Sequence, residues 1–241
     1  METTYRRYPI GIQNFEKIRK NGFFYVDKTA LIYRLVTIGS YYFLSRPRRF
    51  GKSLLISTLE AYFQGKKELF EGLAIEKLED KWEKHPVLHL DLNAEKYDTI
   101  ESLNAILSYQ LTQWEAIYGK GTDETTLSNR FKGVIQRAYE QTGKGVVVLV
   151  DEYDQCIHNI RDKAVLDEVM GVMTPFMQQS FKTNDHIRLG VVTGVMPLLQ
   201  TGMTSGFNNP MVCDILVKDG DEYFGFTESE VMQLLNETGT D

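Results

Sequence analysis

The chain is poor in cysteine and has no long hydrophobic run, and each shortage excludes a class of protein. Its two cysteines, Cys156 and Cys213, lie too far apart for a CxxC motif, and two cysteines do not make a disulfide framework. No apolar run reaches the roughly 18 residues of a membrane helix. Residues 1–8 lack the apolar core of a signal peptide. We therefore predict a cytoplasmic protein with no membrane segment.

Several catalytic motifs are also missing. The chain contains no HExxH and no GxSxG, which excludes the zinc peptidases and serine hydrolases that depend on them. Its four histidines, His85, His89, His158 and His186, show no metal-ligand spacing, and we interpret His89 as a packing residue within a strand. The net charge of −6 does not favour nucleic acid as a partner.

The composition that remains is ordinary for a soluble globular domain, with 42% hydrophobic and 25% charged residues. Short apolar runs rich in β-branched or aromatic residues predict buried strands. These runs are Tyr41–Leu44, Val87–Asp91, Val146–Val150 and Ile187–Thr193. Helices are predicted between them. Strands that alternate with helices indicate an α/β fold with a mostly parallel central sheet flanked by helices.

Three of the predicted helices place apolar residues on one face. Their residues are Leu103, Ile106, Leu107, Leu111, Trp114 and Ile117; Leu127, Phe131, Val134, Ala138 and Tyr139; and Val165, Leu166, Val169, Met170 and Met173. Pro175 is expected to kink or end the third helix. An earlier helix is predicted to begin at residues 27–29 and to end at Gly39. Its core residues are Leu31, Leu35 and Ile38.

The segment Arg46–Ser53 lies between a predicted strand and a predicted helix and has the character of a phosphate-binding loop. Its sequence, RPRRFGKS, lacks only the first glycine of the pattern GxxxxGK[ST], whose place Arg46 takes. Pro47 helps to fix the entry to the loop. The other Gly-Lys pairs, at residues 65–66, 119–120 and 143–144, are not followed by Ser or Thr and follow no predicted strand. Only this segment therefore has the context that the motif requires.

In such loops, backbone N–H groups at a helix N-terminus surround the phosphates, the lysine bridges the β- and γ-phosphates, and the hydroxyl binds Mg²⁺. We predict that this loop binds nucleotide phosphates through Arg48, Arg49, Phe50, Gly51, Lys52, Ser53 and Leu54. A helix cap by Ser53 beside a solvated lysine is the alternative. The arginines of the loop either form a solvated basic turn or include one that contacts the nucleotide.

Asp151 and Glu152 follow an apolar strand, at the carboxyl edge where ligands of α/β sheets bind. We predict that Asp151, with Ser53, holds Mg²⁺ and that Glu152 is the general base that activates water. Asp154 fits either a solvated acid or a second metal ligand. Thr193, at the end of the last predicted strand, is expected to sense the γ-phosphate or orient water; capping the next turn is the alternative.

Asp91 and Asn93 end another predicted strand, and they are either near the metal or simply solvated. That strand lies in the sequence between the strand of the phosphate loop and the strand that ends at Asp151. Together with a glutamate after Asp151, this arrangement resembles the additional-strand class of P-loop ATPases. Nucleoside kinases differ, because in them the two strands are usually adjacent.

The pattern weakens after residue 194. Residues 201–210 predict a loop, and Tyr223–Phe226 predicts one more short strand. Thr227 followed by Glu230 is a capping-box pattern. The helix that it begins carries Val231, Leu234 and Leu235. We predict a P-loop domain over residues 1–220 and the start of a truncated lid or linker over residues 221–241; a natural C-terminus is the alternative.

Several stretches together resemble the bacterial AAA-ATPase-like family. They are Tyr8–Gly11, Tyr25–Thr29, Arg46–Ser53, Val150–Asp154, Val192–Val195 and Tyr223–Thr227. The resemblance spans nearly the whole chain, and members of this family share the arginine-rich loop without the first glycine. Residues 196–204 depart from the charged stretch expected there. Longer members carry a C-terminal nuclease-like domain of the PD-(D/E)XK class, which this sequence lacks, along with most of a lid.

The resemblance implies ATP and Mg²⁺ as cofactors, with ATP at Lys52 and Ser53, Mg²⁺ at Asp151 and catalysis by Glu152. It also implies that residues 25–29 lie where related ATPases hold the adenine. Turnover would then be coupled to a protein partner or to the nuclease-like domain, and assembly into an oligomer is compatible with it. Two alternatives stay open: a nucleotide-dependent binding switch with negligible hydrolysis, and nucleic-acid contact by the arginine loop.

Overall fold

A computed structural model of the chain describes residues 7–93, 99–158, 160–182, 184–196, 211–213 and 225–238. Its centre is a five-stranded, wholly parallel sheet. The strands are β1 (Tyr41–Ser45), β2 (Val87–Asp91), β3 (Val146–Asp151), β4 (Ile187–Gly194) and β5 (Met211–Cys213). The four strands expected from the sequence are confirmed to within about two residues at each end. β5 was not expected, because its three residues are too short a run to be recognised.

The strands lie in the order β2-β3-β4-β1-β5. β4 therefore separates β1, which precedes the phosphate loop, from β3, which ends at Asp151. In a nucleoside kinase the two strands would be adjacent, whereas here β4 lies between them. The structure therefore agrees with the additional-strand arrangement. Parallel pairing of β1 with β4 and of β4 with β3 brings the carboxyl ends of the three strands to one edge of the sheet.

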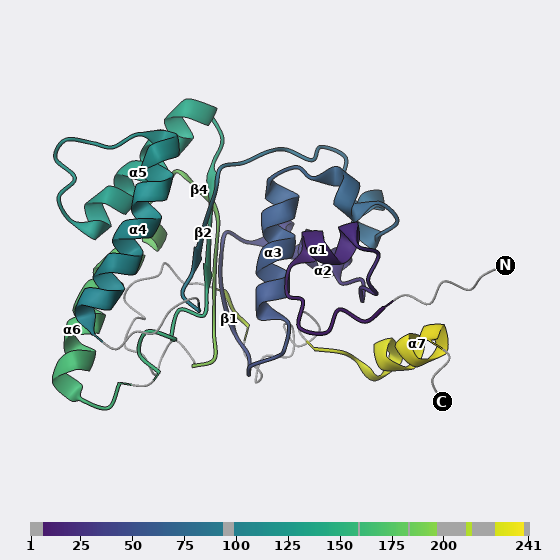
Figure 1. The fold of residues 1–241 in the computed structure, drawn as a ribbon. Helices are drawn as coiled ribbons and strands as arrows, with labels where there is room; N and C mark the ends of the chain where they lie inside the picture. Colours follow the sequence, from purple (N-terminus) through teal and green to yellow (C-terminus); the bar gives the residue numbers. More distant parts are fainter. Residues whose placement is uncertain are drawn as a thin grey trace.

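Helices cover both faces of the sheet (Figure 1). One layer holds α4 (Ile100–Tyr118), α5 (Leu127–Thr142) and α6 (Lys163–Phe181), and the other holds α1 (Phe15–Lys20), α2 (Thr29–Ile38) and α3 (Lys52–Phe63). Two short 3₁₀ helices, Lys67–Phe70 and Ala74–Lys77, extend the second layer. α7 (Glu228–Thr238) lies beside α1 and α2, at the end of the described chain.

The sequence of β3 explains the two layers. All six residues of β3 are buried. Val146, Val148 and Val150 pack in the core under α4, α5 and α6, whereas Val147 and Leu149 pack in the core under α2 and α3. Successive residues of a strand point to opposite faces, so a continuous apolar run is what a strand with helices on both sides requires.

Three expectations about the helices are corrected. Pro175 does not end α6, which continues for two more turns to Phe181. Met173, Phe176 and Phe181 are buried against the sheet, and this burial outweighs the roughly 3 kcal/mol that an internal proline costs. Ile38 and Ile117, which were expected in the core, are 61% and 67% exposed, because each lies in the last turn of its helix.

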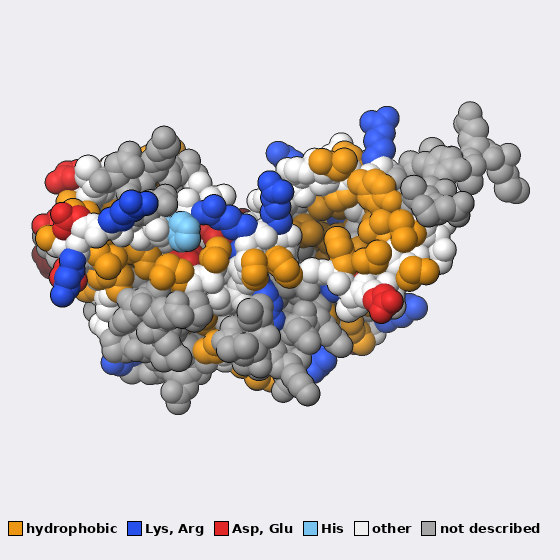
Figure 2. Space-filling view, turned by 90° about the horizontal axis from the view of Figure 1, so that it is seen from below, with side chains coloured by type: hydrophobic (Ala, Val, Ile, Leu, Met, Phe, Trp, Pro, Cys, Tyr) orange, Lys and Arg blue, Asp and Glu red, His pale blue; other side chains and the backbone are white. Residues whose placement is uncertain are grey.

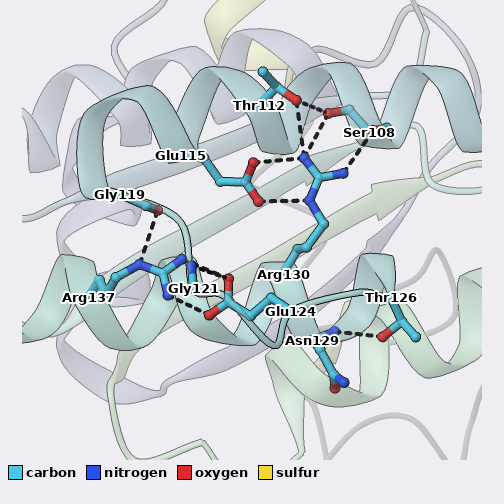
Figure 3. A network of polar contacts seen from close by, with 10 residues as sticks. All are labelled: Ser108, Thr112, Glu115, Gly119, Gly121, Glu124, Thr126, Asn129, Arg130 and Arg137. Carbon is cyan, nitrogen blue, oxygen red and sulfur yellow. Dashed lines mark hydrogen bonds and ion pairs between the residues drawn. The ribbon is translucent and has the colours of Figure 1, made fainter.

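The helical hairpin of α4 and α5 is fixed by a buried ion pair (Figure 3). Arg130 donates from Nε and Nη2 to the two carboxylate oxygens of Glu115, at 2.7 and 2.8 Å. Its Nη1 also donates to Ser108 Oγ at 2.8 Å. A second pair, Arg137 with Glu124, closes the loop between the helices. A guanidinium with most of its donors bonded and a bidentate carboxylate sets one geometry for this layer.

Near the C-terminus, the capping box is confirmed. Thr227 N donates to Glu230 Oε2 at 2.7 Å, and Glu230 N donates to Thr227 Oγ1 at 3.3 Å. The short strand expected at residues 223–226 is not seen at Gly225 and Phe226, and its first two residues lie outside the described part. The loop expected at residues 201–210 also lies outside it.

Candidate nucleotide site

The loop after β1 has the strand–loop–helix geometry that the sequence predicted. β1 ends at Ser45, and α3 begins at Lys52. Gly51 caps α3 with φ of +82°, and a side chain at this position would meet no heavy atom within 4 Å. Arg49 also has a positive φ, of +68°. The α3 N-terminus is thus open at the loop, where an anion can approach backbone N–H groups.

Arg46, which replaces the usual glycine, enters this loop with a negative φ. Its N–H donates to Gly194 O at 3.1 Å, and its side chain is buried. The residue therefore belongs to the packed end of the sheet rather than to a solvated basic turn. Arg48 and Arg49 are exposed, and Arg48 Nη2 reaches Gln155 Oε1 at 3.4 Å.

Lys52 is almost completely enclosed, with 2% of its side chain exposed. Its Nζ donates to Arg46 O at 3.0 Å and to Pro47 O at 3.1 Å. It also lies 3.1 Å from Glu152 Oε1. The ammonium is therefore held inside the curve of the phosphate loop, and the structure brings Lys52 and Glu152 together although 100 residues separate them in the sequence.

Asp151, Glu152 and Thr193 meet at the carboxyl edge of the sheet. Thr193 Oγ1 donates to Asp151 Oδ1 and accepts from the N–H of Glu152 at 3.2 Å. Asp151 is 3% exposed and Thr193 is fully buried. One hydroxyl thus orients the first carboxylate and the backbone that carries the second. The catalytic role of Thr193 stays a prediction, but its position between the two acids is more specific than the cap of a turn.

Glu152 is held in a strained backbone conformation, with φ of +53°. Burial raises the pKa of its carboxyl, and the neighbouring Asp151 and Asp154 raise it further, while Lys52 acts in the opposite direction; the net effect is a raised pKa. A carboxylate with a raised pKa is a better proton acceptor than an exposed one. The site therefore suits a general base at this position.

Asp154 is not a solvated acid. It is 2% exposed, and its Oδ2 accepts from the N–H groups of Val195 and Met196 at 2.9 and 2.6 Å. Gly194 is required beside it, because a Cβ there would lie 2.4 Å from the Tyr153 ring and 2.8 Å from Asp154 Oδ1. Asp154 therefore fastens the end of β4 to the loop that carries Glu152.

Asp91 lies next to Asp151 in register on β2, and Asp91 Oδ1 accepts from Asn93 N at 2.8 Å. Two residues earlier, His89 Nδ1 lies 3.0 Å from Glu60 Oε2. Burial lowers the pKa of His89, but Glu60 and the nearby aspartates more than offset this, so the pKa is raised. His89 is thus an ion-pair partner of α3 rather than only a packing residue.

In the part of the chain that the structure describes, no group of three or more His, Cys, Asp or Glu side chains could hold a metal ion on its own. Mg²⁺ differs from zinc in this respect, because it retains water and binds through one or two carboxylates together with substrate phosphates. Asp151 on β3 and Ser53 in the first turn of α3 offer oxygen donors of the kind that Mg²⁺ prefers. The residues present therefore fit a nucleotide-bound magnesium ion.

A cavity of about 840 Å³ lies beside the phosphate loop. Arg49, Phe50 and Gly51 form its wall on the loop side, and Tyr25, Val26 and Lys28 form a second wall. Tyr25 to Thr29 is the segment that the resemblance placed near the adenine. A third wall is formed by Gly225, Phe226, Val231 and Leu234. These residues lie far from the phosphate loop in the sequence, and only the fold brings them beside it.

Comparison with known proteins agrees with this geometry. Residues 9–204 match a family described as "Predicted AAA-ATPase". The chain belongs to this family. It is also 34% identical over 232 residues to an uncharacterized protein encoded in the vnfD 5′ region of Azotobacter chroococcum mcd 1. The match covers 94% of this chain but 44% of that protein, so the chain spans less than half the length of its relative.

No membrane-crossing helix is found among the described residues of this AAA-ATPase-like protein, since none is both long and apolar enough.

Proposed function

We propose that this protein binds Mg-ATP and hydrolyses its β–γ phosphoanhydride bond. The observation that carries the proposal is the convergence of Lys52, Asp151 and Glu152 at the open N-terminus of α3, beside a cavity large enough for a nucleoside. Membership of a family described as a predicted ATPase supports the same activity.

Each group has a distinct task in the proposed reaction. Backbone N–H groups around Gly51 receive the phosphates, and Lys52 exchanges its loop carbonyls for the β- and γ-phosphate oxygens. Bound Mg²⁺, with Asp151 and Ser53 as its protein donors, would neutralise charge on the phosphates. Glu152 accepts a proton from the attacking water. The Lys52–Glu152 contact must open first, because a carboxylate paired with an ammonium is a weaker base.

Phosphate release is the direct test. Glu152→Gln is expected to bind Mg-ATP and to lose at least about 100-fold in turnover, the usual size of a general-base contribution. Glu140→Gln, at an exposed glutamate on α5, is a matched control that should leave turnover unchanged. Equal turnover in Glu152→Gln and wild type would remove Glu152 as the base, and an absence of Mg-ATP binding by the wild-type protein would refute the proposal.

A second candidate is a nucleotide-dependent binding switch with negligible hydrolysis. The observation that favours it is the ion pair of Glu152 Oε1 with Lys52 Nζ at 3.1 Å, which makes the carboxylate a weaker base. A switch would show a melting shift with Mg-ATP but no steady phosphate release. Steady release that Lys52→Met abolishes would exclude it.

We further propose that the nucleotide cycle acts on a protein partner or on a C-terminal nuclease-like domain of the kind that the family resemblance implies. The length of the Azotobacter protein, of which this chain matches 44%, leaves room for such a domain. Oligomerisation and nucleic-acid binding have no support from the site.

A further inference from the structure

Two side-chain bridges join the phosphate loop to the turn that follows β3. The inner bridge is the ion pair of Lys52 with Glu152, at 3.1 Å. The outer bridge joins residues 107 positions apart in the sequence, because Arg48 Nη2 donates to Gln155 Oε1 at 3.4 Å. Arg48 is exposed, and Gln155 is half-buried. Gln155 is therefore a second side chain, besides Glu152, that reaches from this turn to the phosphate loop.

The turn, residues 152–155, has two sides. Tyr153 and Asp154 are buried, and both are bonded to the end of β4 or to the residue that follows it. The N–H of Gln155 donates to Glu152 O at 2.9 Å, which closes the turn. The backbone thus fixes Glu152 and Gln155 on the side that faces the phosphate loop, while the two residues between them anchor the turn to the sheet.

Figure 2 looks onto the end of the sheet where β1 leads into α3. Lys and Arg side chains are spaced across the middle of this face, and acidic side chains lie beside them. An anion that approaches this face therefore meets exposed cations.

We propose that Gln155 is a further catalytic residue of the hydrolysis, which orients the attacking water beside Glu152, and that Arg48 leaves Gln155 to contact the γ-phosphate. This inference rests on the proposed function. An amide suits the position because it offers both an acceptor and two donors. It also adds no charge to a turn that already carries Asp151, Glu152 and Asp154, whereas another carboxylate would repel the phosphate.

The proposed step divides the work between the two side chains of the turn. Gln155 Oε1 accepts a hydrogen bond from the water, and Gln155 Nε2 donates to a γ-phosphate oxygen. As the water oxygen bonds to the γ-phosphorus, Glu152 takes its proton, and the bond from that phosphorus to the β–γ bridging oxygen breaks. ADP leaves with the electron pair of that bond. Orientation of water by a glutamine is one of the recurring devices of phosphoryl transfer.

The γ-phosphate itself releases the amide. The bond from Arg48 to Gln155 is long for a hydrogen bond, and its acceptor is uncharged. A bond from a guanidinium to a phosphate oxygen is shorter and roughly twice as strong, so the γ-phosphate takes Arg48 from Gln155. ADP lacks this phosphate and leaves the outer bridge in place.

Phosphate release by the full chain with Mg-ATP tests the role of Gln155. Gln155→Ala should lower kcat about 100-fold, the usual size of the loss when a reacting group is misplaced, and leave the Kd for Mg-ATP unchanged. Gln155→Glu, which nearly keeps the shape, should lose as much, whereas a purely structural role would tolerate it. Gln113→Ala, at an exposed glutamine on α4, is the matched control and should keep wild-type turnover.

A transition-state analogue gives a second readout. The wild type should bind Mg-ADP more tightly when aluminium fluoride is present, and Gln155→Ala should lose most of this gain without a change in the Kd for Mg-ADP alone. Steady phosphate release at the wild-type rate by Gln155→Ala, or an equal loss of affinity for both ligands, would overturn the inference and leave the proposed function standing. No phosphate release by the wild type would overturn both.

Arg48 is tested by ligands that differ in the γ-phosphate. Arg48→Gln should raise the Kd for Mg-ATP more than that for Mg-ADP, and should lower kcat by about 10³, the size of effect known for an arginine on a transferring phosphate. Arg34→Gln, at an exposed arginine on α2, should change neither. Equal effects of Arg48→Gln on the two Kd values would contradict the transfer of Arg48 to the γ-phosphate.

Discussion

Replacement of Lys52 should weaken the folded protein as well as nucleotide binding. The ammonium is buried and bonded to two loop carbonyls and to Glu152. Lys52→Met keeps most of the side-chain volume but removes the charge, and this leaves Glu152 largely buried without its cation. Removal of one partner from a buried ion pair costs about 3 kcal/mol of unfolding free energy. For a chain of this length, that corresponds to a fall in melting temperature of about 10 °C.

A double-mutant cycle separates the pair from the rest of the loop. Glu152→Gln replaces the carboxylate by an amide, so Lys52 keeps its two carbonyl partners and loses only the ion pair. The double variant Lys52→Met/Glu152→Gln should be more stable than the sum of the single changes predicts, by about 1–3 kcal/mol, since it leaves no buried charge unpaired. Urea unfolding of the four proteins gives the coupling free energy directly.

The wild type and the Lys52→Met variant also test the binding of Mg-ATP. Mg-ATP at about 100 times its Kd should stabilise the wild type by about 2.7 kcal/mol, and Lys52→Met should lose this shift. Additive single changes, or a Lys52→Met protein as stable as wild type without ligand, would show that Lys52 and Glu152 are not paired in the folded state. Either result would refute the Lys52–Glu152 ion pair, which we infer must open before hydrolysis.

Three further predictions concern the scaffold of the site. Arg130→Met should lower the free energy of unfolding by about 3 kcal/mol at neutral pH. Arg130 lowers the pKa of Glu115 below 4.5, so the ion pair stabilises the wild type above that pH and less as the pH falls through the pKa of the folded protein. Urea unfolding curves of the two proteins should therefore converge in acid. Gly194→Ala should destabilise the folded protein by about 1–3 kcal/mol, because the added methyl group overlaps Tyr153 and Asp154. Gly171→Ala, where a Cβ on α6 meets no heavy atom, should not destabilise it. Equal melting temperatures for the two variants would contradict the close packing at Gly194. The pKa of His89 is raised above 6.5, so its ion pair with Glu60 stabilises the fold below pH 6.5 and less as the pH rises through the pKa of the folded protein. Glu60→Gln should make the free energy of unfolding less dependent on pH in this range. An NMR titration that finds the pKa of His89 at or below 6.5 would refute the prediction.

Much of the fold followed from local patterns. Apolar runs in β1 to β4 and the spacing in α4, α5 and α6 predicted an α/β sheet, because burial on one or both faces imposes a periodicity that the sequence must carry. The capping box at Thr227 and Glu230 could also be predicted from the sequence, since both residues lie within one helical turn. The expected end of the helix at Pro175 and the expected burial of Ile38 and Ile117 were wrong, because these outcomes depend on how far each helix extends over the sheet.

For the candidate site too, some features could be predicted from the sequence and others depend on the fold. The sequence by itself determined the position of the Gly-Lys-Ser loop after β1 and of the acids after β3, because each is a short pattern of consecutive residues. It could not show that Lys52 pairs with Glu152, that Thr193 joins Asp151 to Glu152, or that Asp154 fastens the end of β4. Nor could it show that residues 225–234 form a wall of the cavity beside the loop. These relations depend on strand order and on chain segments far apart in sequence, and only packing of the whole sheet and its helices brings those segments together.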